Sequence, residues 1–367
     1  MVDNFWQSKK VLVTGHTGFK GSWLSLWLLN LGAEVIGLSL EPNTNPSLFE
    51  QLQLEQDLNH NIVDIRNSQL VGSLIASFKP DIVFHLAAQP LVRKSYVESV
   101  ETWNTNVMGT IHVLEAMKGL EKPSALVAIT TDKCYENREW LYGYRENDPL
   151  GGNDPYSSSK AAAEIAIHSW RNSFFANSNI PIGIASARAG NVIGGGDWAE
   201  DRILPDTIRA LINNQPIQVR NPKSTRPWQH VLEPLSGYLE LGKAIYENSI
   251  QRDLNSAFNF GPALESNKSV QSLVELALKY WPGEWLDCSE PQAAHEAKLL
   301  NLVTDKAYHL LGWQPVWDFQ KTVQETIQWY RDASEMEHRD YVKFKDLTSG
   351  QITRYENDKL QQKSKNI

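Results

Sequence analysis

The chain has 367 residues and a formal charge of -8, from 35 lysines and arginines against 43 aspartates and glutamates. Its length predicts about two domains at roughly 150 residues each, and its hydrophobic fraction of 41% excludes wholesale disorder. The acidic balance argues against nucleic acid or an anionic membrane as the main partner. Cys134 and Cys288 fit no disulfide framework or zinc pattern, and the polar start lacks a signal-peptide pattern. We therefore expect a soluble, cytoplasmic, reduced protein without a bound metal.

The first half of the chain alternates short apolar runs with segments of helical length. The expected strands are residues 9–14, 34–40, 81–86 and 124–130, and the expected helices are residues 22–31, 67–78 and 104–118. Strands that alternate with helices predict an α/β fold with a doubly wound parallel sheet of the Rossmann type. The near-continuous apolar strands predict a sheet that is buried on both faces.

The second half differs in composition, with a glycine-rich stretch at 190–197 and a polar stretch with three prolines at 213–227. Residues 257–261 nevertheless look like one more strand of the sheet, so we expect a second, smaller α/β domain that is interleaved with the first. The predicted division is a dinucleotide-binding domain at 1–187 with about 230–262 returning to it, a substrate domain at 188–229 and 263–334, and a polar C-terminal extension at 335–367. That extension is charged and poor in aliphatic residues, so we expect it to become ordered against another subunit.

Residues 14–21 form a glycine-spaced loop between the first strand and the first helix. Gly15 allows a tight turn, Gly18 lets the backbone approach a pyrophosphate, and Gly21 lets the helix pack closely on the strand. The free N–H groups and the dipole of a helix N-terminus favour phosphates at that point. The loop therefore predicts a bound dinucleotide, with an ordinary glycine-rich turn as the alternative.

The second expected strand bears on the choice between NAD and NADP. Ser39 stands where an acidic residue would bind the ribose 2′-hydroxyl, and Glu41 is either its substitute or a solvated loop carboxylate. No arginine follows that strand to hold a 2′-phosphate, which favours NAD. Asp64 is a candidate acceptor for the adenine amino group, or a cap for the following helix.

Tyr156 and Lys160 are one helical turn apart, so their side chains share a face. A phenol with an ordinary pKa near 10 becomes a base at neutral pH only if positive charges stabilise the phenolate, as Lys160 and an oxidised nicotinamide would. Thr131, at the end of a strand, supplies a hydroxyl that can bridge a substrate oxygen and the phenol. The spacing alone more often means a surface pair, and the glycine loop together with Thr131 favours catalysis.

Together these motifs resemble the extended short-chain dehydrogenase/reductase family. The resemblance is carried by residues 14–21, 85–88, 106–109, 130–131 and 156–160 and by Asp64. It implies a Rossmann domain with a smaller nucleotide-sugar domain, and it implies homodimers or homotetramers. The implied NAD contacts are Gly15, His16, Thr17, Gly18, Phe19, Gly21, Asp64, Ile65, Leu86, Ala87, Ala88, Asn106, Thr130, Tyr156 and Lys160. The implied catalytic residues are Thr131, Asp132, Lys133, Tyr156 and Lys160.

Asp132 and Lys133 narrow the resemblance to sugar-nucleotide 4,6-dehydratases. Most of these have Asp-Glu after the threonine, and Lys133 at the glutamate position, with His16 and residues 89–93, resembles those that act on CDP-D-glucose. The similarity continues through residues 188–198 and 226–231 to about 331. It implies conversion of CDP-D-glucose to CDP-4-keto-6-deoxy-D-glucose and water, the first step toward CDP-linked deoxy or dideoxy sugars of cell-surface polysaccharide. The alternatives are a 4-epimerase or reductase of the same fold, or a dinucleotide sensor.

In such a reaction Tyr156 takes the proton of the sugar 4-hydroxyl, Lys133 removes the C5 proton, and a protonated Asp132 gives a proton to the departing 6-hydroxyl. A lysine acts as a base only when its amine is neutral. Burial and nearby Lys160 favour the neutral amine, and Asp132 favours the ammonium. The alternative role for Lys133 is a charge partner of Asp132 or of the substrate.

The nucleoside diphosphate of the substrate needs cationic donors in spite of the acidic net charge. Arg226 is the best candidate for a bidentate phosphate contact, and Arg202 is the second. The remaining predicted substrate contacts are Gln89, Arg93, Asn191 and His295.

Overall fold

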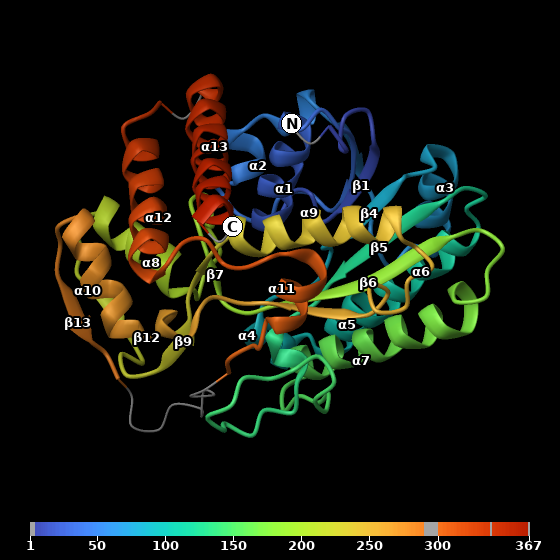
Figure 1. The fold of residues 1–367 in the computed structure, drawn as a ribbon. Helices are drawn as coiled ribbons and strands as arrows, with labels where there is room; N and C mark the ends of the chain where they lie inside the picture. Colours follow the sequence, from blue (N-terminus) through green and yellow to red (C-terminus); the bar gives the residue numbers. More distant parts are fainter. Residues whose placement is uncertain (1–3, 290–299, 338–339, 366–367) are drawn as a thin grey trace.

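A computed structural model describes residues 4–289, 300–337 and 340–365. Its centre is a seven-stranded sheet in the order β11-β6-β5-β4-β1-β2-β3, with every pairing parallel (Figure 1). The strands are β1 (Lys10–Thr14), β2 (Glu34–Ser39), β3 (Asn59–Ile62), β4 (Ile82–His85), β5 (Ser124–Ile129), β6 (Ile182–Ala189) and β11 (Ala257–Phe260). The order reverses between β1 and β4, which confirms the Rossmann-type fold and creates a crevice at the carboxyl ends of these two strands.

Both faces of the sheet are covered, as the apolar strands predict. In β1, Val11 and Val13 enter one hydrophobic cluster, whereas Leu12 enters a second cluster on the opposite face. The helices of the dinucleotide-binding part are α1 (Phe19–Asn30), α2 (Leu48–Gln51), α3 (Ser68–Phe78), α4 (Val92–Val97), α5 (Ser99–Trp103), α6 (Gly109–Lys118), α7 (Pro155–Trp170) and α9 (Leu232–Glu247). Helices α1 and α9 contribute to the first cluster, and α3, α6 and α7 contribute to the second.

Shorter helical segments connect these elements. The 3-10 turns are η1 (Leu54–Gln56), η3 (Asp132–Cys134) and η5 (Leu264–Ser266), and the π-helical turns are η2 (Asn104–Met108) and η4 (Arg171–Phe175). The helix expected over 104–118 is therefore a π turn followed by α6, and the strand expected over 257–261 is β11.

Two strands of the sheet are not predicted by the sequence patterns. The edge strand β3 has the sequence Asn-His-Asn-Ile and exposes or half-exposes all four side chains, so it carries no apolar run. The inner strand β6 is fully buried, but it contains Ser186 and Arg188, which break its apolar pattern. Both residues bind Glu164, and this contact makes their burial tolerable.

The second part of the chain lies at one end of the central sheet (Figure 1). It contains three small two-stranded sheets, in which β7 pairs with β10, β8 with β13, and β9 with β12. Its elements are β7 (Val192–Ile193), α8 (Ile203–Ile212), β8 (Ile217–Val219), β9 (Thr225–Pro227), β10 (Gln229–His230), β12 (Asn267–Ser269), α10 (Val270–Tyr280), β13 (Trp285–Asp287), α11 (Asp305–Leu311) and α12 (Phe319–Ser334).

The C-terminal segment is the helix α13 (Tyr341–Lys365), which packs on its own chain beside α1 and α12. The expectation that it becomes ordered against another subunit is therefore wrong. Phe344, Ile352 and Tyr355 form a buried stripe, and the Tyr355 hydroxyl donates a hydrogen bond of 2.8 Å to Glu233. A few side chains on one face of a helix suffice to dock it, although the segment as a whole is polar.

Among the described residues, no helix is long and apolar enough to cross a membrane.

Candidate active site

The loop between β1 and α1 has the geometry of a diphosphate cradle. Gly15 has a φ of +76°, and a Cβ atom there would lie 2.8 Å from the Ala87 nitrogen. At Gly21 a Cβ atom would lie 2.1 Å from the Gly15 oxygen, so both positions require glycine. Gly18 begins α1 without a side-chain cap, which leaves the first N–H groups of the helix available. These features fit the diphosphate of a dinucleotide.

Two predicted cofactor residues of this loop turn their side chains away from the cradle. The fully buried His16 ring contacts His60 at 2.7 Å, between its Nε2 and the His60 Nδ1, and packs on Gly37 of β2. Burial, helped by His60, lowers the pKa of His16 to about 3, so the ring is neutral. The Thr17 hydroxyl contacts the Ser39 hydroxyl at 2.8 Å. Only the backbone of His16 and Thr17 remains for a phosphate.

Predicted contacts from β3, β4 and the segments after them frame the same crevice. The Leu86 N–H donates to the Thr14 carbonyl at 3.1 Å, and the Ala87 N–H donates to the Thr14 hydroxyl at 3.1 Å, with Ala88 following. Beyond β3, Asp64 accepts from Nε of Arg66 at 2.9 Å. Ile65 is buried and lies against Gly109 of α6, where a Cβ atom would be 2.8 Å from its Cγ2. Phe19 packs near Gly194 of the second part of the chain.

The polar groups of three other predicted ligand contacts are already used within the protein. Gln89 donates through Nε2 to Thr102 at 2.9 Å and accepts from the Leu91 N–H at 2.6 Å. Asn106 accepts from the Gln89 N–H at 2.8 Å and donates to the Ser159 hydroxyl at 2.9 Å. These hydrogen bonds make Gln89 a loop anchor and let Asn106 position α7. The substrate contact of Gln89 and the cofactor contact of Asn106 stay predictions.

The third is Thr130, whose hydroxyl donates to Glu164 Oε1 at 2.5 Å. This hydrogen bond ties the end of β5 to α7 beneath the site. The cofactor contact of Thr130 stays a prediction.

The predicted catalytic side chains come from two adjacent elements. Thr131 ends the segment after β5 and begins η3, and its hydroxyl donates to Asp132 Oδ1 at 3.0 Å. Tyr156 and Lys160 lie on the first two turns of α7, where Asp154 caps the helix by accepting from the Ser157 N–H at 2.9 Å. Thr131 is also close enough to Tyr156 for its hydroxyl to act on the pKa of the phenol, which it lowers.

The charge states of Tyr156 and Lys160 follow from their burial. Burial raises the pKa of Tyr156 to about 12, against the opposing effect of the Thr131 hydrogen bond. Burial lowers the pKa of Lys160 to about 8, while Glu164 acts to raise it. The expectation of a lowered phenol pKa is therefore not met by the chain itself, because desolvation of the phenolate outweighs the neighbouring groups.

Asp132 and Lys133 occupy the positions that define the predicted subfamily. Burial raises the pKa of Asp132, although Lys133 and Lys20 act to lower it. The Oδ2 atom of Asp132 is buried without a hydrogen-bond partner in the described structure and faces Gly190. A carboxyl in this environment favours its protonated form and has one oxygen free to donate. Lys133 is half-buried beside it.

A buried ion pair lies directly beneath the catalytic helix. Glu164, one turn after Lys160, accepts from Arg188 of β6 at 2.9 Å, and both side chains are at most 4% exposed. Arg188 also donates to the Tyr135 hydroxyl at 2.7 Å, and that hydroxyl donates to Asn259 of β11 at 2.7 Å. This network ties α7, β6 and β11 together below the reacting groups.

The predicted substrate residues divide into those near the catalytic groups and those at the rim. Arg202 begins α8, pairs with Asp197 at 2.8 Å, and is close enough to Tyr156 to affect its pKa. Arg226 lies in β9 and donates to the Thr225 carbonyl at 2.7 Å. The half-buried Asn191 lies between β6 and β7. His295 lies outside the described residues.

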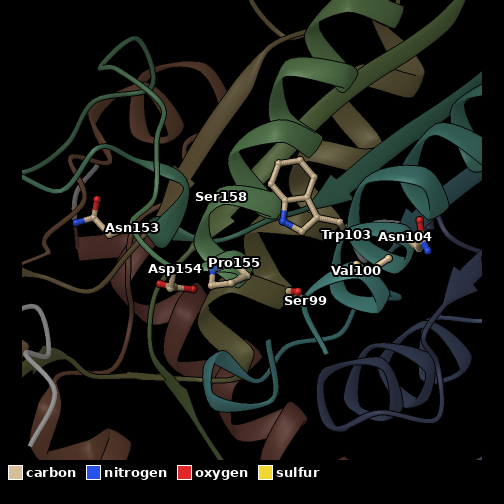
Figure 2. Close-up of a pocket in the computed structure, with 8 residues that line it drawn as sticks. All are labelled: Ser99, Val100, Trp103, Asn104, Asn153, Asp154, Pro155 and Ser158. Carbon is tan, nitrogen blue, oxygen red and sulfur yellow. The ribbon is translucent and has the colours of Figure 1, made fainter. Parts of the chain in front are cut away.

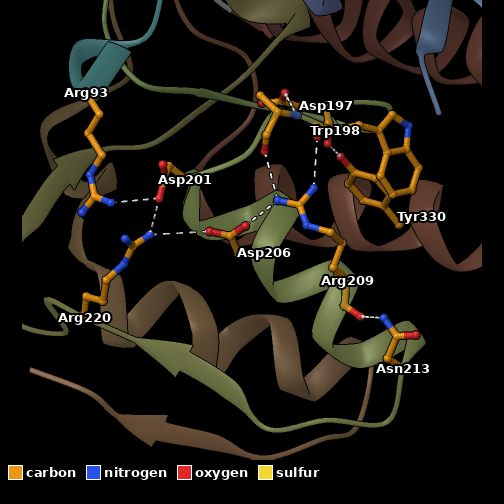
Figure 3. A network of polar contacts seen from close by, with 10 residues as sticks. Arg93, Asp197, Trp198, Asp201, Asp206, Arg209, Asn213, Arg220 and Tyr330 are labelled. Carbon is orange, nitrogen blue, oxygen red and sulfur yellow. Dashed lines mark hydrogen bonds and ion pairs between the residues drawn. The ribbon is translucent and has the colours of Figure 1, made fainter. Parts of the chain in front are cut away.

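Arg93 is the predicted substrate residue that lies at the rim of the site. Figure 3 shows it directed at Asp201, and the two pair at 3.0 Å, while Arg220 reaches the same carboxylate at 3.0 Å and Asp206 at 3.8 Å. Arg93 is exposed and paired in this way, so the structure gives it a contact between the two parts of the chain. Its substrate contact stays a prediction.

Lys20, the second residue of α1, is not among the predicted site residues. Its ammonium is close enough to Asp132, Lys160, Arg202 and Asp197 for each to affect its pKa. The sequence contains one indication of a special role for this residue, because the helix dipole disfavours a cation in the first turn of a helix. Among the described residues, no group of three or more His, Cys, Asp or Glu side chains could hold a metal ion.

The sequence of the chain is similar to those of known 4,6-dehydratases. The family model described as GDP-mannose 4,6 dehydratase matches residues 12–326. A CDP-glucose 4,6-dehydratase of Salmonella typhimurium is 51% identical over 337 residues, which cover 90% of this chain and 93% of that protein. A dTDP-D-glucose 4,6-dehydratase of Bos taurus is 25% identical over 332 residues, or 89% of each chain.

Solved structures share the fold. A dTDP-glucose 4,6-dehydratase of Bacillus anthracis in complex with NAD is 20% identical with a TM-score of 0.73 over 89% of this chain and 98% of that one. A UDP-glucose-4-epimerase of Stenotrophomonas maltophila is also 20% identical, with a TM-score of 0.76 over 89% of this chain and 99% of that one. The family match begins within β1 and ends in α12, so it contains the other six strands of the central sheet and most of β1. The chain therefore belongs to the GDP-mannose 4,6 dehydratase family, within the extended short-chain dehydrogenases/reductases.

Proposed function

We propose that the protein converts CDP-D-glucose to CDP-4-keto-6-deoxy-D-glucose and water with NAD as its cofactor. The observation that carries this proposal is Asp132, a buried carboxyl with an unpartnered oxygen, placed beside Thr131 and Tyr156. A simple epimerase or reductase has no use for a buried acid at this position, whereas elimination of water needs one. The relative that is 51% identical is a CDP-glucose 4,6-dehydratase, which supports CDP-D-glucose as the substrate.

The glycine cradle and the N-terminus of α1 would hold the diphosphate of NAD, and Asp64 would face its adenine end. When bound, this cofactor supplies the oxidant for the sugar C4 and the reductant for C6. The protein positions the sugar between Tyr156 and η3 and excludes water, since Thr131, Asp132 and Tyr156 are each at most 8% exposed. Lys160 is held on the same face of α7, where its ammonium donates to the Ile129 carbonyl at 3.2 Å.

The proton movements fall to these side chains. Tyr156 accepts the proton of the 4-hydroxyl, with Thr131 donating to the sugar oxygen or the phenolate. Once C4 is a ketone, the C5 proton becomes acidic, and Lys133 is the base that removes it. The protonated Asp132 gives its proton through Oδ2 to the 6-hydroxyl as it leaves.

The second part of the chain would bind the nucleotide. We assign residues 188–229 and 263–334 to this role, and residues 1–187 with about 230–262 to the cofactor. Arg226 and Asn191 are the proposed phosphate contacts, and Arg202 would bind while it is held by Asp197.

The test is incubation of the protein with CDP-D-glucose and NAD, followed by proton NMR. A dehydratase gives a new 6-methyl signal, and in deuterated water it incorporates deuterium at C5. A galactose-configured product would show an epimerase, and an unchanged spectrum with bound NAD would show a sensor. Either result contradicts the proposal.

We further propose that the protein is a homodimer. Val97, Val100 and Ile165 are 86%, 74% and 60% exposed on α4, α5 and α7, an unusual concentration of apolar surface on adjacent helices. A hollow of about 500 Å³ lies between α5 and the start of α7, and Figure 2 shows Trp103 and Pro155 on its wall. A second copy related by two-fold symmetry would cover the same patch on both chains. Light scattering after gel filtration should give a dimer for the native protein and a monomer for Val100→Glu.

The location is proposed as cytoplasmic. Both cysteines are free, and the buried Cys134 lies within η3. A nucleotide sugar and NAD are metabolites of a reducing compartment, where free thiols persist.

A further inference from the structure

His85 is a buried histidine that the proposed mechanism does not use. It ends β4, directly before residues 86–89, and its side chain is buried. Its Nδ1 atom lies 2.8 Å from the Thr14 hydroxyl, and its Nε2 atom lies 3.0 Å from the Thr110 hydroxyl. Burial lowers the pKa of His85 to about 3, and Lys160 acts in the same direction, so the ring is neutral. A neutral imidazole has one donor and one acceptor, and both have a partner here.

The partners of His85 determine which of its nitrogens carries the proton. The Thr110 hydroxyl donates its single proton to the Asn106 carbonyl at 2.7 Å. Towards His85 it can therefore only accept, which places the imidazole proton on Nε2. The Nδ1 atom is then an acceptor, and the Thr14 hydroxyl donates to it while it accepts from the Ala87 N–H at 3.1 Å. The hydrogen bonds from Ala87 to Asn106 thus form one chain with a single direction.

One end of this chain holds the backbone beside the glycine cradle. Thr14 is the last residue of β1 and is fully buried. Its hydroxyl accepts from the Ala87 N–H, and its carbonyl accepts from the Leu86 N–H at 3.1 Å. The Ala87 nitrogen is also the atom that a Cβ at Gly15 would approach to 2.8 Å, so this backbone packs on the cradle itself. A shift of the Thr14 side chain would therefore change the shape of the cradle.

The other end of the chain holds the catalytic helix α7. Asn106 lies in the π turn η2, and such turns within helices are frequent at functional sites. Its side chain donates to the Ser159 hydroxyl at 2.9 Å, and that hydroxyl donates to the Tyr156 carbonyl at 2.7 Å. Asn106 and Ser159 are both buried, so water does not compete for these hydrogen bonds. His85 therefore reaches the first turn of α7 through Thr110 and Asn106.

We propose that His85 is a positioning residue with two separable roles, in which its Nδ1 atom supports the cofactor cradle and its Nε2 atom supports the turn that carries Tyr156. The inference rests on the proposed function for its catalytic half. One nitrogen serves each contact, so loss of one contact should impair one step and spare the other. A histidine that served only the stability of the fold would show no such division.

Two substitutions separate the two nitrogens. The amide oxygen of His85→Asn lies near the position of Nδ1, so this variant keeps the contact with Thr14 and loses the contact with Thr110. The longer side chain of His85→Gln brings its amide nitrogen near the position of Nε2, so this variant keeps Thr110 and loses Thr14. Each variant removes one buried hydrogen bond, which matches the two in their expected cost in stability. Ile75→Val shortens a fully buried side chain of α3 and is the control for a general loss of stability.

Three measurements are compared: the dissociation constant of NAD from quenching of tryptophan fluorescence, kcat at saturating NAD, and amide hydrogen exchange of the cofactor-free protein. In His85→Gln we expect NAD to bind about tenfold more weakly, the effect of one buried hydrogen bond, with kcat within about twofold of the native value. Exchange should be faster over residues 86–89. In His85→Asn we expect kcat to fall about tenfold and NAD binding to stay within about twofold, with faster exchange over residues 104–110 and 156–160. Ile75→Val should change neither kcat nor the dissociation constant.

Equal losses of NAD binding and of kcat in both variants would mean that His85 serves only local packing, and the inference would be overturned. It would also be overturned if neither value moved in either variant. A native protein that binds NAD but forms no 6-methyl product from CDP-D-glucose would contradict the proposed function alone, and the opposite exchange patterns of the two variants would still support the two roles of His85. A native protein that does not bind NAD would contradict both.

Discussion

Replacement of Glu164 by Gln tests whether the buried ion pair beneath α7 is needed for stability and for the state of Lys160. The amide has nearly the same shape as the carboxylate. Its oxygen can accept from Ser186 and Arg188, and its nitrogen can donate to the Thr130 hydroxyl. The substitution therefore removes the charge and keeps the contacts.

The expected loss of stability follows from what remains. Arg188 is 4% exposed and also lies over the Tyr135 ring, 4.8 Å from its centre, so it cannot move into water without unpacking the cluster. A buried charge that loses its partner costs about 3–5 kcal/mol. We expect Glu164→Gln to lower the free energy of unfolding by about that amount. The exposed pair of Lys94 and Glu98, 3.2 Å apart, gives the control, because Glu98→Gln should cost at most about 1 kcal/mol.

The pH dependence of the stability contribution of Glu164 has a sign that follows from its pKa shift. Burial acts to raise the pKa of Glu164, but Arg188 and three hydrogen bonds outweigh it and the pKa is lowered. Its contribution is therefore present above the ordinary glutamate pKa of about 4.3 and is lost as the pH falls through the folded value. Urea unfolding should show this acid loss in the native protein and not in Glu164→Gln.

Glu164 also acts to raise the pKa of Lys160, which is about 8. In Glu164→Gln the ammonium should therefore deprotonate at lower pH, and the alkaline limb of cofactor reduction by the sugar should move to lower pH. An unfolding free energy within about 1 kcal/mol of the native value, with an unmoved pH profile, would refute the reasoning.

Three further predictions concern the proposed base Lys133, the contact of Glu233 with Tyr355 of the C-terminal helix α13, and the glycine cradle. Lys133→Met should abolish deuterium exchange at the sugar C5 and leave initial cofactor reduction measurable by absorbance; retained exchange would exclude Lys133 as the base. Burial raises the pKa of Glu233 to about 7, so stability should fall by about 3 kcal/mol as the pH rises from about 4.5 to 7, and Glu233→Gln should remove this fall in urea titrations. Gly21→Ala should abolish dinucleotide binding in a fluorescence titration, since its Cβ would lie 2.1 Å from the Gly15 oxygen. Gly72→Ala, with nothing within 4 Å, should bind normally.

The central sheet was largely predictable because its strands are buried on both faces. Apolar runs locate β1, β2, β4 and β5 without reference to anything distant in the sequence. β6 escapes this reasoning because its polar residues are satisfied by Glu164, a partner on another element. A sequence pattern shows that Arg188 is polar, and only the folded chain shows that burial is possible for it.

The backbone shape of the site could be predicted from the sequence more fully than the roles of its side chains. Glycine spacing sets the shape of the cradle, because it constrains the chain locally. The motif around Asn106 and Gln89 predicts a site, but a sequence pattern cannot distinguish a residue that touches a ligand from one that holds another residue. That distinction depends on the hydrogen bonds that each amide makes with residues far away in the sequence.

The distinction also gives a physical criterion for assigning roles at this site. Gln89, Asn106 and Thr130 have their side-chain donor groups paired within the protein, so a ligand could reach these side chains without loss only through a remaining lone pair of an oxygen. Asp132, in contrast, keeps a buried oxygen unpartnered in the described structure. Burial makes this oxygen costly in the free protein, and a ligand that forms a hydrogen bond with it recovers part of that cost. In the proposed function, an acidic protein of charge -8 binds anionic nucleotides through a few well-placed cations and helix N–H groups, because local charge and not net charge acts at this distance.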